Sequence, residues 1–280
     1  MELKKYLLLD KKVGETPLEV LDEFKRANHT YAAVRLSYAG RLDPLASGSL
    51  LVLVGDECKK QDKYLGMDKE YEFQVALGIS TDTADVLGMA TLAPEDDHVK
   101  IANRIAELDI EKYNTDIQKT FIRKHTWPYP GFSSKTVNGV PLFKHALEGT
   151  LDSIEIPTKE IQIFDLKCTN TEIISSQNFF EKISEKIESI KPVTEHTKAL
   201  GNDFRRPEIR ERYIALQKNS PENFVVLSFT CTCTSGSYMR TLAEKIASTF
   251  DTKGLAFSIH RTQIGRYKKI GPFGFWYKKF

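Results

Sequence analysis

The chain has 280 residues, of which 41% are hydrophobic and 28% charged, and its formal net charge is +2. This length suffices for a large core in one α/β domain or in two smaller ones. The sequence contains no run of eighteen apolar residues and no basic N-terminal segment followed by an apolar stretch. These absences exclude a membrane-spanning or exported class, so we expect a cytoplasmic protein.

Charge is segregated along the chain. Residues 201–280 carry 14 Lys and Arg against 6 Asp and Glu, whereas the first 200 residues carry 26 against 32. The basic C-terminal part is suited to contact with phosphates. An ordinary solvent-exposed basic face is the alternative explanation for the same excess of positive charge.

The four cysteines are expected to be structural thiols. Cys231 and Cys233 alternate along an expected strand and point to one face, and no second Cys or His pair follows at metal spacing. The pattern therefore predicts neither a zinc site nor a disulfide.

Periodicity and capping residues predict interleaved helices and strands. Thr16, Pro17 and Glu19 combine an N-cap, a first-turn proline and a capping box, which together mark a helix start. The other expected elements are strands at 49–55, 71–77 and 225–233 and helices at 141–147 and 239–250. This mixed order favours an α/β or α+β fold with long-range strand pairing.

The most informative stretch is Gly40-Arg41-Leu42-Asp43-Pro44-Leu45-Ala46-Ser47-Gly48. Pro44 fixes its own φ and disfavours a helical Asp43, and Gly40 and Gly48 permit tight turns on either side. One carboxylate is thereby held in a constrained loop beside a buried strand. Asp43 is the candidate reacting group, and an ordinary Asp-Pro turn is the plain alternative.

This stretch resembles the G-x-L-D-P-x-A-x-G pattern of the TruB-type tRNA pseudouridine synthases. Further blocks match that family in order and spacing, at 7–11, 14, 69–71, 81–85, 88, 130–134, 137–139, 235–241 and 260–265. The resemblance implies a single catalytic domain over 1–280, with a central mixed, largely antiparallel sheet flanked by helices. It also implies isomerisation of the T-loop uridine of tRNA, position 55 in tRNA numbering, after base flipping.

The family's site residues carry over to matching positions. The resemblance implies that Asp43 attacks the sugar or assists loss of a sugar proton, and that Arg240 pairs with this carboxylate through a two-pronged hydrogen bond. Tyr71 is implied to stack on the target base or to take up a proton, although its ring also fits a core position. The implied substrate-binding residues are Lys11, Tyr38, Tyr238 and Ile259. Tyr38 is a departure, because the family generally has His there.

No metal and no cofactor is needed for this isomerisation, and the expected partner is the T-arm of tRNA. We expect a monomer that uses no guide RNA, because guide-dependent relatives carry a C-terminal PUA domain, which we do not expect here. Two alternatives stay open. One is a catalytically silent tRNA-binding or RNA-folding protein, and the other is a synthase for a different RNA uridine, since Gly40-Arg41-Leu42-Asp43 also resembles the G-R-L-D of the RluA-type enzymes.

The segment 171–222 does not match the family pattern and is predicted to be a helical insertion. Apolar residues from Phe179 to Ile190 recur at helical spacing, and a second helix is expected from Pro207 to Leu216. The linker of this insertion holds Arg205, Arg206, Arg210 and Arg212. Such a hairpin could grip RNA from the side or pack on its own domain.

Overall fold

The computed structural model describes residues 3–190, 205–271 and 273–280. Its strands are β1 (Tyr6–Lys11), β2 (Leu36–Tyr38), β3 (Ala46–Val54), β4 (Asp68–Leu77), β5 (Ile79–Thr81), β6 (Ala90–Leu92), β7 (Lys124–Pro128), β8 (Thr136–Val137), β9 (Val140–Pro141), β10 (Thr158–Ser175), β11 (Asn223–Cys233), β12 (Gly254–Ile270) and β13 (Phe273–Lys279). Its α-helices are α1 (Pro17–Ala27), α2 (Gln61–Leu65), α3 (Glu95–Ala106), α4 (Ile110–Phe121), α5 (Leu142–Leu147), α6 (Ser176–Ser189), α7 (Arg206–Gln217) and α8 (Met239–Ser248). Short 3₁₀ helices are η1 (His29–Tyr31), η2 (Gly55–Lys60) and η3 (Leu151–Ser153).

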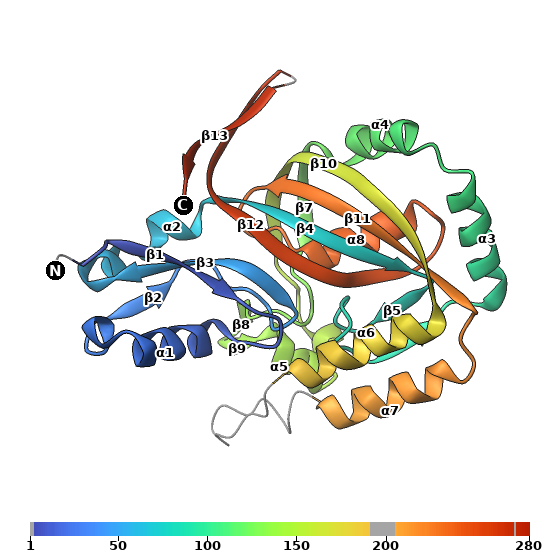
Figure 1. The fold of residues 1–280 in the computed structure, drawn as a ribbon, viewed down its shortest axis with the longest axis horizontal. Coiled ribbons are helices and arrows are strands. Elements are labelled where there is room, and N and C mark those ends of the chain that lie inside the picture. Colours follow the sequence, from blue (N-terminus) through green and yellow to red (C-terminus); the bar gives the residue numbers. More distant parts are fainter. Residues whose placement is uncertain (1–2, 191–204, 272) are drawn as a thin grey trace.

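One large sheet organises the molecule (Figure 1). Within the described ranges, nine strands form it in the order β1-β3-β12-β4-β11-β10-β7, with β2 beside β3 and β13 beside β12. β3 and β12 run parallel, and the other neighbouring strands are antiparallel. The predicted mixed, largely antiparallel sheet is therefore confirmed.

Alternation along the central strands creates two hydrophobic clusters. In β4, Phe73 and Val75 belong to a cluster that includes residues of α4 and α8, whereas Ala76 belongs to a second cluster with residues of α6 and α7. Successive side chains of a strand point to opposite faces, so the helices are divided between the two sides of the sheet.

The N-terminal helix begins as the sequence predicts. The backbone N–H of Thr16 donates to Glu19 at 2.7 Å, and the backbone N–H of Glu19 donates to the Thr16 hydroxyl at 3.2 Å, which completes the capping box. Val20 and Leu21 of this helix then pack on β3. Burial of this face holds β3 in place, and the Asp43 loop leads directly into that strand.

Several predicted boundaries differ from the structure by a few residues, among them the starts of β4 at Asp68 and β11 at Asn223. The buried strand starts at Ala46 rather than residue 49, because pairing of β3 with β12 extends back to Ala46. The last helix ends at Ser248 rather than 250. Residues 171–175 of the expected helical insertion are strand, since they continue β10 and pair with β11. The middle of the insertion, 191–204, lies outside the described residues, and α6 and α7 confirm its two expected helices.

Candidate active site

The Asp43 loop connects β2 to β3 and is tightly turned. Gly40 and Gly48 have φ of 93° and 98°, as the sequence predicts for these two glycines. A Cβ on Gly48 would lie 2.4 Å from the carbonyl oxygen of Arg261, so only glycine fits between these two backbones. The N–H of Ala46 donates to the carbonyl of Asp43 at 3.0 Å, which closes a turn around Pro44.

Two buried cations hold the backbone of this loop. Lys11 is fully buried, and its ammonium group donates to the carbonyls of Lys12 at 3.0 Å, Pro44 at 3.3 Å and Ala46 at 2.5 Å. Burial lowers the pKa of Lys11 to about 8. The structure thus places Lys11 behind the loop, where it orients the backbone, rather than in the cavity where a substrate contact was expected.

Arg261 is the second of these cations and was not among the expected site residues. The residue is 1% exposed, and its guanidinium group donates to the carbonyls of Ser49 at 2.8 Å and of Gly40 and Arg41 at 3.3 Å. Arg261 and Lys11 together hold both ends of the loop through hydrogen bonds to backbone carbonyls. The block 260–265 had pointed to this region without indicating a residue.

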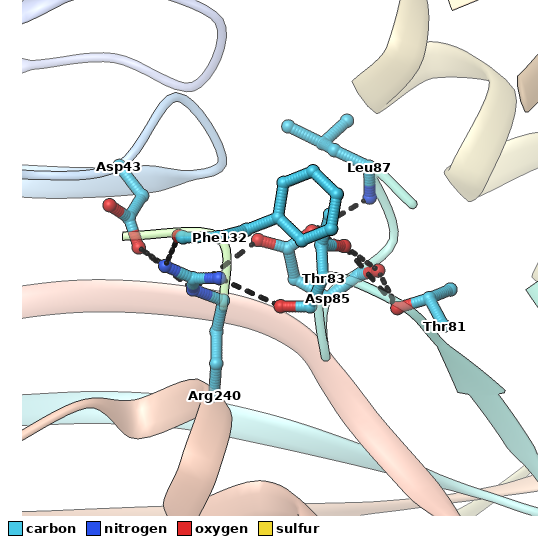
Figure 2. A network of polar contacts seen from close by, with 7 residues as sticks. All are labelled: Asp43, Thr81, Thr83, Asp85, Leu87, Phe132 and Arg240. Atoms are coloured by element: carbon cyan, nitrogen blue, oxygen red, sulfur yellow. Dashed lines mark hydrogen bonds and ion pairs between the residues drawn. The ribbon is translucent and has the colours of Figure 1, made fainter. Parts of the chain in front are cut away.

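Arg240 contacts Asp43, as the resemblance implied (Figure 2). Nε of Arg240 donates to Oδ2 of Asp43 at 2.9 Å, and Nη2 lies 2.8 Å from the same oxygen. Nε and Nη2 of Arg240 therefore both contact one carboxylate oxygen of Asp43, instead of each contacting a different oxygen. The Asp43 side chain remains 39% exposed, whereas that of Arg240 is 4% exposed.

Two further donors of Arg240 are also occupied. Nη1 donates to the carbonyl of Thr83 at 2.7 Å, and Nη2 donates to the carbonyl of Phe132 at 3.0 Å. Burial opposes the charge, but Asp43 and Asp85 outweigh it, so the pKa of Arg240 lies above its usual value. The guanidinium group is consequently fixed in position and permanently charged.

Asp85 is a second carboxylate beside Arg240 that sequence reasoning missed. Its Oδ2 lies 3.7 Å from Nε of Arg240, and its Oδ1 accepts from the Thr83 hydroxyl at 2.8 Å and the Leu87 N–H at 2.9 Å (Figure 2). Burial raises the pKa of Asp85 above the usual carboxyl value, and Arg240 opposes this rise. The matching block 81–85 was the available signal, but it could not show that this residue turns inward.

A cavity of about 600 Å³ opens above the Asp43–Arg240 pair. The expected residues that line it are Tyr38, Asp43, Tyr71, Tyr238, Arg240 and Ile259. Lys11 is the expected residue that does not line it. The volume falls in the range of ordinary ligand sites.

Tyr71 lies at the buried end of this cavity and is 9% exposed. Burial raises the pKa of its phenol to about 12, although Arg261 acts in the opposite direction. The hydroxyl is therefore protonated at neutral pH. Lys69, which also lines the cavity, donates to the carbonyls of Leu65 at 3.1 Å and Met67 at 2.5 Å, and burial lowers its pKa to about 8.

The insertion forms part of the cavity wall through Ile187, Ile190 and Ile209. At the start of α7, Arg205 adopts a left-handed backbone conformation with φ of 60°. Its guanidinium group lies 2.6 Å from Oδ2 of Asp82 and 4.8 Å from the centre of the Phe132 ring.

The other insertion arginines also contact the protein itself. Nη1 of Arg206 donates to the carbonyl of Ile190 at 2.5 Å, and Nε of Arg212 donates to the carbonyl of Ala90 at 2.6 Å. Arg210 pairs with Glu188 of α6. These contacts favour the packing alternative for the insertion over the RNA contact.

All four cysteines are buried free thiols, as expected. The described part of the chain contains no group of three or more His, Cys, Asp and Glu side chains placed to bind a metal ion. None of its helices combines the length and the apolar character needed to cross a membrane.

Comparison of the chain with known proteins points to one family. The family model described as "TruB family pseudouridylate synthase (N terminal domain)" matches residues 28–185, which is more than half of the chain. A tRNA pseudouridine synthase B of Rickettsia akari (strain Hartford) is 27% identical over 235 residues, which cover 84% of this chain and 59% of that protein. One of Borrelia garinii subsp. bavariensis is 24% identical over 263 residues, or 94% of this chain and 70% of that protein.

A solved structure of a Cbf5–Nop10–Gar1 complex is also similar, with a TM-score of 0.46 and 15% identity over 93% of this chain and 48% of that chain. The chain thus spans only part of the length of the proteins it resembles, about three fifths of the Rickettsia relative.

Proposed function

The chain belongs to the TruB family of pseudouridylate synthases, and from this premise we propose that it isomerises the T-loop uridine of tRNA to pseudouridine. One observation carries the proposal. Arg240 directs two N–H groups at Oδ2 of Asp43 inside a cavity built from the family's motif blocks. The names of the Rickettsia and Borrelia relatives support tRNA as the substrate.

The geometry of Asp43 supports a reaction at its second oxygen. Arg240 engages Oδ2, while Oδ1 has no hydrogen-bond partner among the residues the structure describes. We infer that Oδ1 acts on the ribose, either as nucleophile at C1′ or in removal of a sugar proton. In the first route an Oδ1–C1′ bond forms as the N1–C1′ bond breaks, and it breaks again when C5 bonds to C1′. In the second route the sugar loses its proton as the N1–C1′ bond breaks and regains one when the C5–C1′ bond forms. In both routes the uracil turns between these steps, and the C5 proton leaves while N1 gains one.

The target base must leave its stack to reach this carboxylate. Tyr71 offers a buried aromatic face beside Asp43, and stacking of a base on such a ring is worth about 1 to 3 kcal/mol. We propose that Tyr71 is this platform, that Tyr238 and Ile259 form the wall of the base pocket, and that Tyr38 contacts the substrate near its entrance. Since the Tyr71 phenol is protonated at rest, any proton it accepts must follow an earlier transfer of its own proton.

Recognition is proposed to rest on the shape of the T-arm, because RNA helices hide their major-groove edges while loops expose their bases. Action as a monomer without a guide RNA, in the cytoplasm and without a metal or cofactor, belongs to the same proposal. A catalytically silent tRNA-binding protein is the competing function, and retention of Asp43, Tyr71 and Arg240 in one cavity speaks against it.

We predict that Asp43→Asn abolishes turnover, because an amide can neither attack the sugar nor remove its proton as a carboxylate does. Affinity for tRNA should stay within about tenfold, roughly 1.4 kcal/mol, since the side-chain shape is kept. The measurement incubates each protein with an unmodified tRNA transcript and maps pseudouridine by base-specific chemical labelling and primer extension.

Two controls sharpen this experiment. Asp56→Asn removes a carboxylate that is 90% exposed on η2 and should leave turnover unchanged. A transcript with cytidine at the T-loop position should yield no product. Substantial turnover by Asp43→Asn would remove Asp43 from the mechanism. Binding without modification by the unaltered protein would favour the silent alternative, and product elsewhere in the transcript would identify a different uridine.

A further inference from the structure

The end of β12 and the whole of β13 form a two-stranded arm that extends away from the rest of the molecule (Figure 1). Residues 265–280 contain five Lys and Arg, six aromatic residues and no Asp or Glu. No residue of this arm lines the cavity that holds Asp43 and Arg240. Its composition differs sharply from the nearly neutral chain as a whole.

One face of the arm is anchored to the protein body. The Tyr267 ring packs edge-on against Trp276, with ring centres 5.2 Å apart, and lies 5.4 Å from Phe164 of β10. The ammonium group of Lys269 donates to the carbonyl of Phe164 at 2.6 Å. A Cβ on Gly274 would lie 1.6 Å from the Tyr267 hydroxyl, so glycine is required there. These contacts hold the arm in one orientation before any partner binds.

The opposite face carries cations and aromatic rings in register. Lys268 pairs across the arm with Phe275, and Ile270 pairs with Phe273. Phe273 is 76% exposed and Phe275 is 47% exposed. Lys278 pairs with Arg266, beyond a register shift that separates this pair from Tyr267 and Trp276. Its side chain is exposed, and its ammonium group lies 4.8 Å from the centre of the Phe280 ring. Within the described residues, neither Lys268 nor Lys278 has an acidic partner.

This combination fits RNA better than a protein or a lipid surface. Large exposed rings mark an interaction site, and cations interleaved with rings in the absence of any carboxylate complement a chain of phosphates carrying flat bases. The arm also continues β12, which carries Ile259 at the cavity. Nine residues separate Ile259 from Lys268, so the two lie at most about 30 Å apart. One RNA of tRNA size can therefore span both.

We propose that the β12–β13 arm is a second RNA-contact surface, on which Lys268 and Lys278 bind backbone phosphates while Phe273 and Phe275 stack with an exposed base or ribose. The proposal rests on the proposed function in taking tRNA as the bound RNA. The arm would contribute to RNA binding but not to the reaction, because Asp43 and Arg240 lie in the cavity and not on the arm.

The test compares two double variants with the unaltered protein on one unmodified tRNA transcript. Lys268→Gln/Lys278→Gln should weaken binding and reduce the slope of log affinity against log salt concentration by about 1.4 to 1.8, the effect of two lost phosphate contacts. Phe273→Ser/Phe275→Ser should weaken binding about fivefold or more with an unchanged salt slope. The single-turnover rate at saturating protein should stay the same in both. Lys100→Gln/Lys119→Gln, which removes two exposed charges from α3 and α4, should change neither quantity.

Unchanged affinity and salt slope in both arm variants would overturn the proposal. So would variants that alter only sedimentation, which would mark a contact between copies of this chain, or only binding to anionic lipid vesicles. The proposed function is tested separately by the unaltered protein. If it binds the transcript through the arm but makes no pseudouridine, the proposed function is wrong and the proposed RNA contact of the arm is supported. If it modifies the transcript and the arm variants have the same affinity and salt slope as the unaltered protein, only the proposed RNA contact of the arm is wrong.

Discussion

At the scale of single residues, Arg240 lies between two carboxylates of different exposure. The Asp43 side chain is 39% exposed and that of Asp85 is 6% exposed. Because burial raises the pKa of Asp85, its ionised form is held in the folded protein at a cost in stability. We infer that the ionised Asp85 carboxylate, despite this cost, keeps Arg240 oriented toward Asp43. Asp85 is thus a positioning residue.

We predict that Asp85→Asn slows turnover about tenfold to 100-fold while sparing stability at neutral pH. The amide oxygen can still accept from Thr83 and Leu87, but the charge beside Arg240 is lost. A carboxyl group whose pKa is raised by folding contributes stability at low pH and loses that contribution as the pH rises through the raised value. The Tm of the variant minus that of the unaltered protein should therefore be more positive at about pH 7.5 than at about pH 4.

Thermal unfolding at the two pH values, together with single-turnover kinetics, checks this prediction. Asp116→Asn, which alters a carboxylate that is 60% exposed on α4, should give the same Tm difference at both pH values and normal turnover. Turnover by Asp85→Asn equal to that of the unaltered protein would show that Asp85 does not position Arg240.

At the scale of elements, the insertion touches two loops that hold Arg240. Arg205 of the insertion pairs with Asp82 and covers the Phe132 ring, and Phe132 accepts a hydrogen bond from Arg240. The left-handed backbone of Arg205 costs about 1 kcal/mol, so these contacts must offset it. The insertion thereby supports the candidate active-site cavity from one side.

We predict that Arg205→Met lowers the single-turnover rate about threefold to tenfold and leaves tRNA affinity and its salt slope unchanged. The ion pair and the cation–π contact are each worth about 1 kcal/mol, and their loss frees both loops. A double-mutant cycle with Asp82→Asn should show coupling in the rate. Arg210→Met, whose partner Glu188 lies within the insertion, serves as the matched variant and should keep the rate. A reduced salt slope in Arg205→Met would instead show that the insertion contacts RNA.

At the scale of the whole molecule, the insertion shares a core with the sheet. Phe179 of α6 is fully buried, and its ring stacks on Phe224 at 4.0 Å and on Phe257 at 5.1 Å between ring centres. Phe224 belongs to β11 and Phe257 to β12, so the insertion completes one face of the central sheet. This packing supports the prediction that 171–222 lies within one domain.

We predict that Phe179→Ala lowers the free energy of unfolding by about 3 to 5 kcal/mol, because it leaves a cavity between α6 and the central sheet. Urea unfolding followed by tryptophan fluorescence and by circular dichroism should show one transition with both probes. Ile214→Ala on α7, where the side chain is 59% exposed, should change the free energy by less than about 1 kcal/mol. A separate early transition in Phe179→Ala would show that the insertion unfolds on its own.

Several features were open to prediction because their causes are local. The Thr16 capping box, the positive φ of Gly40 and Gly48 and the alternation along β4 and β11 depend on neighbours in the chain. Segment boundaries are harder to predict from the sequence. The start of β3 and the strand at 171–175 depend on partner strands far away in sequence. No local pattern distinguishes a strand end from a helix start when both are apolar.

By itself, the sequence determined the class of fold, the constrained Asp43 loop and the family pattern that joins this loop to Tyr71 and Arg240. Only the tertiary structure decided that Lys11 holds the backbone of the Asp43 loop, that Asp85 and Arg261 are buried beside the site, and that Arg205 contacts Asp82 and Phe132. The reason is physical. Turn and capping preferences act between neighbouring residues, whereas burial and ion pairing depend on which distant segments the sheet brings together.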